Sequence, residues 1–372
     1  MKTDIIVVGG YGHVGGQICK LLADSYPGHI YAAGRNIERA ELFCRAVGGR
    51  VKPLRLDVGK PIPKQLLERA KVVIMCLDQT ATDFAMACLK EGIAYIDVSA
   101  NGLFFEAMEQ LKKQDVTLKG TALLSVGLAP GLTNLLSLKA VQALDTAERI
   151  EIGIMLGLGD AHGKAAIEWT VDSLTQSFSI TEHHRLRKVS SFDEGKKADF
   201  GGSWGNRTAY RFPFSDQQTL PTTLGVPSIS TRLCFDSRFV TKTIAVLQRL
   251  GFMRLLRIGW IRELAIQSFG KLRIGSEGYA VKIAGYGKQG EMDTIVEFGL
   301  QGEKEADITA GVAAAAAMAM YESELPKGIF HVEQLFELNL HEQGIALRLK
   351  GNEDAWDVST VNPIQSWSRT RT

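Results

Sequence analysis

The chain has 372 residues, a length typical of two domains, and 45% of them are hydrophobic, so the composition favours a packed globular protein over a disordered one. The formal net charge is only +2, which gives no argument for nucleic-acid binding. The five cysteines are scattered without CxxC spacing, the N-terminus has no signal-peptide pattern, and no apolar run reaches the roughly 18 residues of a membrane span. We therefore expect a cytoplasmic protein with reduced thiols.

The first third of the chain alternates short apolar runs with helical patterns. Strands are expected at 5–8, 30–33, 51–56, 72–77, 94–98 and 122–126, and helices at 14–25, 37–47, 65–69, 80–91 and 104–114. Fully apolar runs such as 72–77 are typical of strands that are buried on both faces of a parallel sheet. The alternation predicts an α/β fold, with a Rossmann doubly wound domain over residues 1–127.

The pattern changes near Gly127. Longer strands are expected at 150–155, 209–212, 232–235, 279–284 and 294–300, the last two as an antiparallel hairpin, with helices at 165–178 and 240–269. This predicts an α+β domain over 128–305 with a mixed, largely antiparallel sheet, one face of which would stay open to a substrate or to a second subunit in a homodimer.

The last part of the chain begins with an alanine-rich helix at 306–322. Small side chains allow close packing, so we expect this helix to be buried and, with the segment after it, to return to the first domain. The tail after Asn352 has few apolar anchors and is expected to fray.

The segment 232–273 carries nine basic residues and two acidic ones, alternating with large apolar residues. One interpretation is an amphipathic helix lying on anionic lipid. The other, which the sequence favours, is a solvated helix face or an arginine-lined substrate mouth.

A complete GxGxxG motif follows the first expected strand and opens the first expected helix. It consists of Gly10, Tyr11, Gly12, His13, Val14 and Gly15. In this context Gly10 would make the tight turn, Gly12 would admit the pyrophosphate of a dinucleotide, and Gly15 would let the helix lie close to the strand.

The end of the second strand indicates which dinucleotide binds. An NAD site needs a carboxylate here, but the chain reads Gly34, Arg35 and Asn36. The planar guanidinium of Arg35 suits a 2′-phosphate, and Asn36 could add a donor. The sequence therefore predicts NADP(H).

Two further strand ends are candidates for cofactor contacts. Asp57 and Val58 end the third strand, where they would flank the adenine, although Asp57 could equally be an N-cap. Cys76, Leu77 and Gln79 end the fourth strand, where the chain should pass the nicotinamide.

These motifs together resemble the saccharopine dehydrogenase family. The resemblance lies in GGYGHVG at 9–15, AGR at 33–35, YID at 95–97, GLAPGLTN at 127–134, AAAAAMAM at 313–320 and PKGIFHVEQL at 326–335. It implies a Rossmann domain, a second domain with substrate contacts and a dimer interface, and NAD(P)-linked chemistry at a carbon–nitrogen bond of an amino acid or amine. The chain departs from the family after the fourth and fifth strands, so saccharopine itself is not carried over as the substrate.

The remaining polar residues at this edge are candidates for handling protons and substrate. Asp97, Asp78 and His162 are the candidate catalytic groups, and the expected substrate contacts are Gln79, Ser99, Gly127, Pro130, Gly131 and Asn134. Asp97 could instead be an N-cap or the partner of an arginine. No metal site is expected. The alternatives to an enzyme of this type are an NADP-sensing regulator without turnover and a peripheral membrane-associated reductase.

Overall fold

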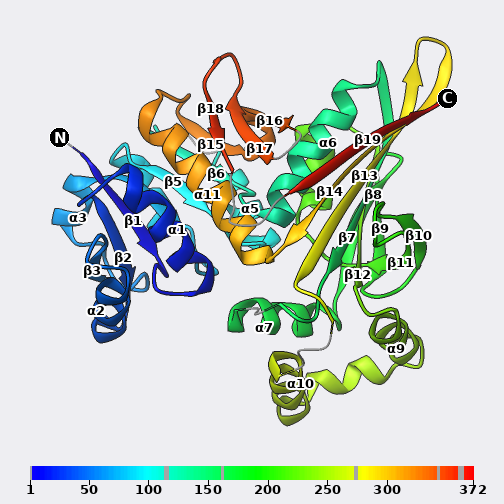
Figure 1. Ribbon diagram of the computed structural model, residues 1–372, viewed down its shortest axis with the longest axis horizontal. Helices are drawn as coiled ribbons and strands as arrows, with labels where there is room; N and C mark the ends of the chain where they lie inside the picture. Colours follow the sequence, from blue (N-terminus) through cyan, green and yellow to red (C-terminus); the bar gives the residue numbers. More distant parts are fainter. Residues whose placement is uncertain (1, 113–116, 161–162, 272–274, 342–343, 359–363) are drawn as a thin grey trace. The chain divides into compact units, whose positions relative to one another are not determined.

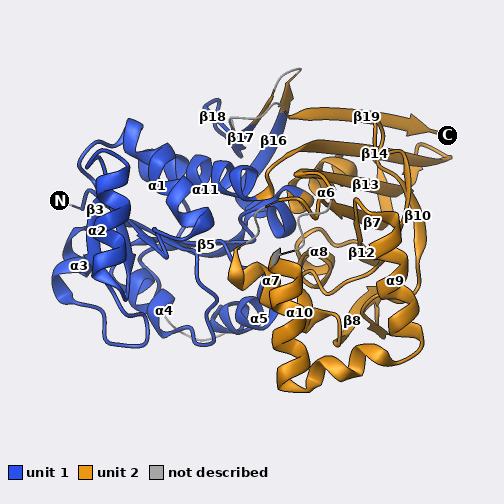
Figure 2. Cartoon of the chain, turned by 60° about the horizontal axis from the view of Figure 1, so that its bottom comes forward, with its two compact units in different colours: residues 1–132, 306–339, 346–360 blue, residues 133–305, 340–345, 361–372 orange. Residues whose placement is uncertain are grey.

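The computed structural model describes residues 2–112, 117–160, 163–271, 275–341, 344–358 and 364–372. Its contacts divide the chain into two compact units (Figure 2). Unit 1 contains residues 1–132, 306–339 and 346–360, and unit 2 contains residues 133–305, 340–345 and 361–372.

Unit 1 is built on a seven-stranded parallel sheet (Figure 1). Its strands are β1 (Asp4–Val8), β2 (Ile30–Gly34), β3 (Lys52–Arg55), β4 (Ala70–Met75), β5 (Ala94–Asp97), β6 (Thr121–Leu124) and β15 (Gly328–His331), in the order β15-β6-β5-β4-β1-β2-β3. The six strands expected from the first third of the chain are all present. The seventh, β15, was not predicted; it comes from the last part of the chain and pairs with β6 in parallel.

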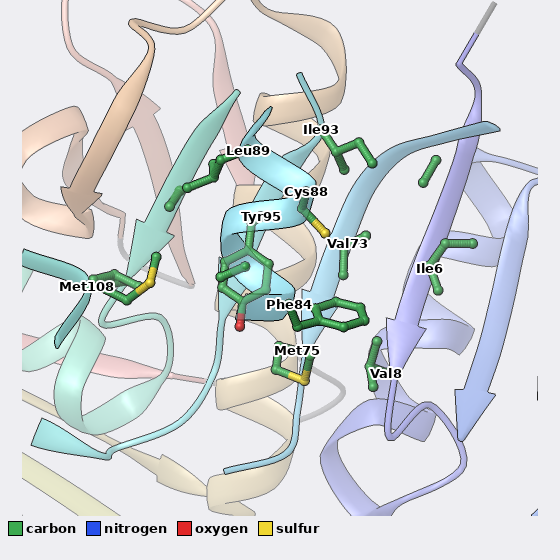
Figure 3. Close-up of a cluster of buried hydrophobic side chains, with 14 of the residues drawn as sticks. Ile6, Val8, Val73, Met75, Phe84, Cys88, Leu89, Ile93, Tyr95 and Met108 are labelled. Atoms are coloured by element: carbon green, nitrogen blue, oxygen red, sulfur yellow. The ribbon is translucent and has the colours of Figure 1, made fainter. Parts of the chain in front are cut away.

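The helices of unit 1 follow the strands as the doubly wound pattern requires. They are α1 (His13–Ser25), α2 (Ile37–Ala46), α3 (Lys64–Arg69), α4 (Asp83–Lys90), α5 (Gly102–Leu111), the short α12 (Val332–Leu335) and α11 (Glu305–Glu322). The expected burial of the alanine-rich helix is observed, since Ala313 to Ala317 are all buried. Figure 3 shows part of the core, where Tyr95 lies among Phe84, Cys88, Met75 and Met108.

Unit 2 contains a nine-stranded mixed sheet. Its main path is β10 (Lys196–Asp199), β11 (Asn206–Arg211), β12 (Ser228–Phe235), β7 (Thr146–Leu156), β13 (Gly278–Gln289), β14 (Met292–Glu303) and β19 (Gln365–Arg371), while β8 (Ser177–Glu182) pairs with β12 and with β9 (Arg185–Ser190). The pair β12–β7 is parallel and the other pairs are antiparallel. The expected hairpin is β13–β14, closed by the two residues between Gln289 and Met292.

The helices of unit 2 are α6 (Thr133–Gln142), α7 (Lys164–Ser173), α8 (Asp216–Thr223), α9 (Arg238–Arg249), the 3₁₀ helix η2 (Phe252–Arg257) and α10 (Gly259–Lys271). The single helix expected at 240–269 is therefore three pieces. Gly251 has a φ of +80° and ends α9, because a left-handed residue cannot continue a right-handed helix.

The C-terminal tail was expected to fray, and that expectation is wrong. β19 pairs with β14 over seven residues, and the indole N–H of Trp367 donates to the backbone oxygen of Phe200 at 3.3 Å. Strand pairing supplies the order that apolar composition alone did not indicate. A further small sheet, also not predicted, consists of β16 (Phe336–His341), β17 (Gly344–Leu349) and β18 (Ala355–Asp357).

Candidate cofactor and substrate site

The strand ends that carry the candidate residues are level with one another at one edge of the unit 1 sheet. Val8 lies opposite both Ala33 and Met75, and Met75 lies opposite Asp97. Because all these strands are parallel, the segments that follow β1, β2, β4 and β5 leave the sheet at the same edge. In open α/β sheets this carboxyl edge is where ligands bind.

The glycine positions of the motif are required by backbone contacts. A Cβ at Gly10 would lie 2.6 Å from the backbone oxygen of Val7, and one at Gly15 would lie 2.3 Å from that of Gly9. A Cβ at Gly12 would approach only the oxygen of Gly9, at 3.0 Å. Gly10 therefore lets the turn pack against β1, and Gly15 lets the start of α1 pack against the turn. At Gly12 the absence of a side chain leaves the space beside the backbone clear.

The N-terminus of α1 suits an anion. Gly12 is the N-cap, no side chain caps the helix, and its first turn, which begins with His13 and Val14, contains no acidic residue. The backbone N–H groups and the helix dipole there favour negative charge. This bare helix start and the glycine turn before it fit the pyrophosphate of a dinucleotide.

Tyr11 fixes the turn after β2. Its hydroxyl accepts the backbone N–H of Asn36 at 3.1 Å, and a Cβ at Gly34 would lie 2.3 Å from the same hydroxyl. The guanidinium of Arg39 lies over the Tyr11 ring, 5.5 Å from its centre. Gly34 is thus required by the tyrosine packed against it, and the turn that presents Arg35 is held from both sides.

Arg35 is exposed and makes no hydrogen bond or ion pair with the described residues. Asn36 caps α2, because its Oδ1 accepts the N–H of Arg39 at 2.7 Å. The Asn36 carboxamide oxygen is therefore committed to the helix, whereas the Arg35 guanidinium remains available to a ligand.

The residues after β3 lie at the same edge but serve local structure. The Asp57 carboxylate accepts the N–H of Gly59 at 3.1 Å and closes a turn. It is not the N-cap of the next helix, since α3 begins after Pro63. Val58 is half-buried and packs against the core.

The segment after β4 folds back over the glycine turn. A Cβ at Gly9 would lie 3.1 Å from the Leu77 side chain, so Leu77 covers that turn. Cys76 is half-buried, and its burial raises the pKa of the thiol to about 12. The side-chain amide of Gln79 donates to the backbone oxygens of Leu77 and Asp78, at 3.4 and 3.1 Å.

Asp97 is fully buried at the end of β5, with 0% of its surface exposed. Its Oδ2 accepts the Tyr95 hydroxyl at 3.0 Å, and its Oδ1 accepts the N–H and the hydroxyl of Ser99 at 2.9 and 2.5 Å. Burial raises the pKa of Asp97 to about 6, although these three donors act in the opposite direction. The donors come from its own strand and the loop after it, and the N-cap of the next helix, α5, is Asn101 rather than Asp97.

The loops after β4 and β5 are tied together. The Asn101 side chain donates to the backbone oxygen of Gln79 at 3.2 Å while its own oxygen caps α5 by accepting from Leu103 and Phe104. Ser99 lies between these anchored points and is 8% exposed. Its hydroxyl is the side-chain group of this loop that donates to the buried Asp97 carboxyl.

A second buried polar array begins after β6, the strand paired with β5, and was not predicted. The Ser125 hydroxyl is 2.7 Å from Nδ1 of His331, and Nε2 of that histidine is 2.8 Å from Glu109. Ser125 and His331 are both fully buried and lie 206 positions apart in the chain. His331 belongs to the sequence motif at 326–335, but no pattern in the sequence indicates its contact with Ser125.

Residues 5–123 match the family model of the saccharopine dehydrogenase NADP binding domain. This part of the chain is a saccharopine dehydrogenase NADP-binding domain. The resemblance to that family is thereby confirmed for residues 5–123.

Solved structures agree with this saccharopine dehydrogenase fold. Apo saccharopine dehydrogenase (L-Glu forming) from Saccharomyces cerevisiae is similar with a TM-score of 0.61 and 12% identity, over 88% of this chain and 94% of that one. Diaminopimelate (DAP) dehydrogenase of C. glutamicum in complex with DAP has a TM-score of 0.41 and 12% identity, over 90% and 94% of the two chains. An engineered D-amino acid dehydrogenase has a TM-score of 0.44 and 14% identity, over the same shares. The first likeness shows the fold, and the other two carry no argument. No curated protein sequence matches the chain significantly.

The other expected substrate residues lie in different parts of the saccharopine dehydrogenase-like chain. Gly127 and Gly131 have φ values of +159° and +141° and flank Pro130 in a buried loop of unit 1, where the N–H of Leu128 donates to Thr309 at 3.3 Å. Asn134 lies in α6 of unit 2 and is fully buried. His162 lies outside the described residues.

No group of three or more histidines, cysteines or acids in the described chain is placed to hold a metal ion. Among the described helices, none is long and apolar enough to cross a membrane.

Proposed function

We propose that this protein is an NADP(H)-dependent oxidoreductase that acts on a carbon–nitrogen bond of an amino-acid-like substrate, by imine reduction or amine oxidation. The observation that carries the proposal is the match of residues 5–123 to the saccharopine dehydrogenase NADP binding domain. The similar yeast structure is a saccharopine dehydrogenase that forms L-glutamate, which supports an amino-acid-like substrate.

The phosphates of the cofactor would lie against the helix start at Gly12 and the turn at Gly10, with Gly15 keeping that helix close. Arg35 would bind the 2′-phosphate, since it is exposed, without a described partner, and presented by a turn that Tyr11 holds. The remaining proposed cofactor contacts are His13, Val14, Gly34, Asn36, Asp57, Val58, Cys76, Leu77 and Gln79. NADPH should therefore bind more tightly than NADH.

Asp97 is the proposed proton carrier of the reaction. A pKa of about 6 lets the carboxyl exist in both protonation states near neutral pH. Because Asp97 is fully buried, it would exchange protons through the Ser99 hydroxyl at 2.5 Å rather than touch the substrate nitrogen directly. The bound nicotinamide would supply the hydride chemistry, and the chain would orient the substrate and hold the proton.

Gln79 and the loop from Gly127 to Gly131, with Pro130 in it, are proposed to contact substrate, and Asp78 is the second candidate acid because it is exposed beside Asp97. Asn134 as a substrate contact, a homodimer and a cytoplasmic location remain predictions from the sequence.

Steady-state turnover of NADPH with a panel of amines paired with 2-oxo acids tests the proposal, together with the reverse oxidation of secondary amines by NADP⁺. Turnover with at least one pair is expected. A second candidate function is an NADP-sensing regulator without turnover, favoured by one observation: the Asp97 carboxyl has no exposed surface. Tight NADPH binding with no turnover on any pair would support the regulator and contradict the enzyme.

A further inference from the structure

The helical arm formed by α9, η2 and α10 has an unusual surface. We define the arm as residues 238–264; Figures 1 and 2 show it as a continuous helical excursion from unit 2. Eight of the fourteen exposed large hydrophobic side chains among the described residues lie in it: Phe239, Val246, Leu250, Phe252, Leu255, Ile258, Trp260 and Leu264. Phe239 is 80% exposed and Trp260 is 70% exposed. Scattered single exposures are ordinary, but a cluster of this size on one segment indicates a surface that is covered by something.

The arm is attached to unit 2 by its other side. Thr241 and Ile244 of α9 are buried, as is Met253 of η2, and Ile266 of α10 is buried just beyond the arm. On α9 the exposed residues Phe239, Val246 and Leu250 follow one another at helical spacing, on the face away from Thr241 and Ile244. The outward apolar face is therefore not a part of the unit 2 core that happens to be loosely packed.

The attachment includes one specific ion pair. The guanidinium of Arg262 makes two hydrogen bonds to the carboxylate of Asp172 on α7, at 2.5 and 2.7 Å. This fork-to-carboxylate geometry holds α10 against α7 and uses one of the arm's six basic residues.

The charges on the exposed face have one sign. Lys242, Arg249, Arg254 and Arg257 are exposed and make no ion pair with the described residues. Glu263 is the only acid in the arm. Cations therefore alternate with bulky apolar groups along the same outward surface.

We propose that this arm docks the protein on a membrane surface that contains anionic phospholipid. An interfacial helix inserts its apolar side chains at the boundary between headgroups and acyl chains, while lysine and arginine attract anionic headgroups and an indole lies at the interface. The absence of a spanning helix among the described residues is compatible with this mode, because the arm would lie on the bilayer rather than cross it.

A second copy of the chain is a poorer occupant. A two-fold contact through the arm would place two surfaces of the same positive charge against each other, each with Lys242, Arg249, Arg254 and Arg257, and like charges across an interface cost binding energy. Anionic headgroups instead supply the opposite charge along the whole arm. The inference uses no residue of the cofactor site, so it stands or fails independently of the proposed activity.

The test is co-sedimentation of the full chain with vesicles of phosphatidylcholine alone and of phosphatidylcholine mixed with phosphatidylglycerol, at low and at raised salt. Binding to the mixed vesicles at low salt, weakened by salt, is expected. Each cation close to an anionic surface is worth about five-fold in partitioning, so Lys242→Gln with Arg254→Gln should weaken binding by about 25-fold. Phe239→Ser with Trp260→Ser should weaken it by at least roughly tenfold for each side chain.

Matched controls come from β9 of the same unit, where Leu186 is 79% exposed and Lys188 is also exposed. Leu186→Ser and Lys188→Gln should bind vesicles as the unchanged protein does. All these positions are exposed, so the variants should keep the melting temperature. A blue shift of tryptophan emission on adding mixed vesicles, lost in Trp260→Phe, would place the indole in the interface.

Three results would overturn the proposal. The first is no sedimentation with mixed vesicles above a vesicle-free sample. The second is binding that the arm variants and the β9 controls weaken equally. The third is an oligomer in light scattering that the arm variants dissolve, without vesicle binding, which would assign the surface to a protein contact instead.

Discussion

The strands β2 and β5 open onto the same edge of one sheet, yet the charges at their ends have opposite surroundings. Arg35 after β2 is exposed and makes no described hydrogen bond or ion pair. Asp97 at the end of β5 is fully buried and accepts hydrogen bonds from Tyr95 and Ser99. A charge without a protein partner at a ligand-binding edge is available to a ligand, whereas a charge already satisfied inside the protein can act only through the groups that bind it.

The roles given to Arg35 and Asp97 both require that the cofactor binds at this edge of the sheet. A substitution at Gly12 tests this requirement. The residue has extended φ and ψ of −80° and −178°, which valine can adopt, and only the Gly9 oxygen is near its Cβ position. Gly12→Val should therefore abolish binding of NADPH and of NADH with the fold largely intact, because the branched side chain would occupy the space for the pyrophosphate. Fluorescence titration with thermal melting measures both.

The matched control is Gly259→Val, at the start of α10, where nothing lies within 4 Å of the Cβ position. It should bind both cofactors normally. Normal NADPH binding by Gly12→Val would mean that the phosphates lie elsewhere.

The proposed role of the buried Asp97 is tested by measuring turnover. Asp97→Asn keeps the shape of the side chain and removes its charge, so turnover should fall by roughly 10²–10⁴ while cofactor affinity hardly changes. Ser99→Ala should also lower turnover if the proton passes through its hydroxyl, and Asp78→Asn, at an exposed position, should cost less.

A purely structural Asp97 gives the reverse pattern: a lower melting temperature with activity per folded molecule preserved. Measuring kcat and thermal stability on the same preparations separates the two roles.

Arg35 and Asp97 also show which features of the site could be predicted from the sequence and which could not. Apolar runs and the glycine motif predicted six strands of the parallel sheet and the turn that carries Arg35, because these depend on local periodicity. The buried Asp97 carboxylate is bound by a tyrosine two positions away on the same face of β5, whereas the sequence suggested a helix cap or an arginine partner. Long-range pairs had no local signal: Ser125 with His331, and β19 with β14.

The raised pKa of Asp97 predicts a pH dependence of folding stability. Its folded pKa of about 6 lies above the ordinary 3.8, so the unfolded chain releases this proton first as the pH rises. The stability contributed by the protonated carboxyl is fully present below about pH 4 and is lost as the pH rises through about 6. The shift of about two units corresponds to about 3 kcal/mol.

Chemical denaturation of the unchanged protein and of Asp97→Asn at several pH values measures this. The difference in unfolding free energy between the two proteins should fall by about 3 kcal/mol between pH 4 and pH 7. A difference that stays constant over that range would show that Asp97 titrates normally.

The proposed role of the exposed Arg35 is tested by measuring the preference for NADPH over NADH. Arg35→Asp replaces a phosphate partner with a carboxylate that can accept from ribose hydroxyls and that repels the 2′-phosphate. Each lost charge-assisted hydrogen bond should cost about 1.5–3 kcal/mol, so NADH should become the preferred cofactor. Arg45→Asp, an exposed residue in the last turn of α2, is the control and should leave the preference unchanged. Equal affinities of the unchanged protein for NADPH and NADH would remove the assignment.

The smallest effect is expected next to Arg35, at Asn36, where the sequence indicated a phosphate donor and the structure shows a helix cap. The Asn36 Oδ1 accepts the N–H of Arg39 at 2.7 Å, so Asn36→Ala should lower the free energy of unfolding by about 1 kcal/mol and leave the preference for NADPH nearly unchanged. Asn36→Asp keeps an accepting oxygen for the cap but places a negative charge beside the guanidinium that would bind the 2′-phosphate. It should therefore retain stability and weaken NADPH more than NADH. Denaturant melts and paired titrations on the two variants give the two quantities separately. A loss of NADPH preference in Asn36→Ala equal to that in Asn36→Asp would show that the carboxamide binds the phosphate as well as capping the helix.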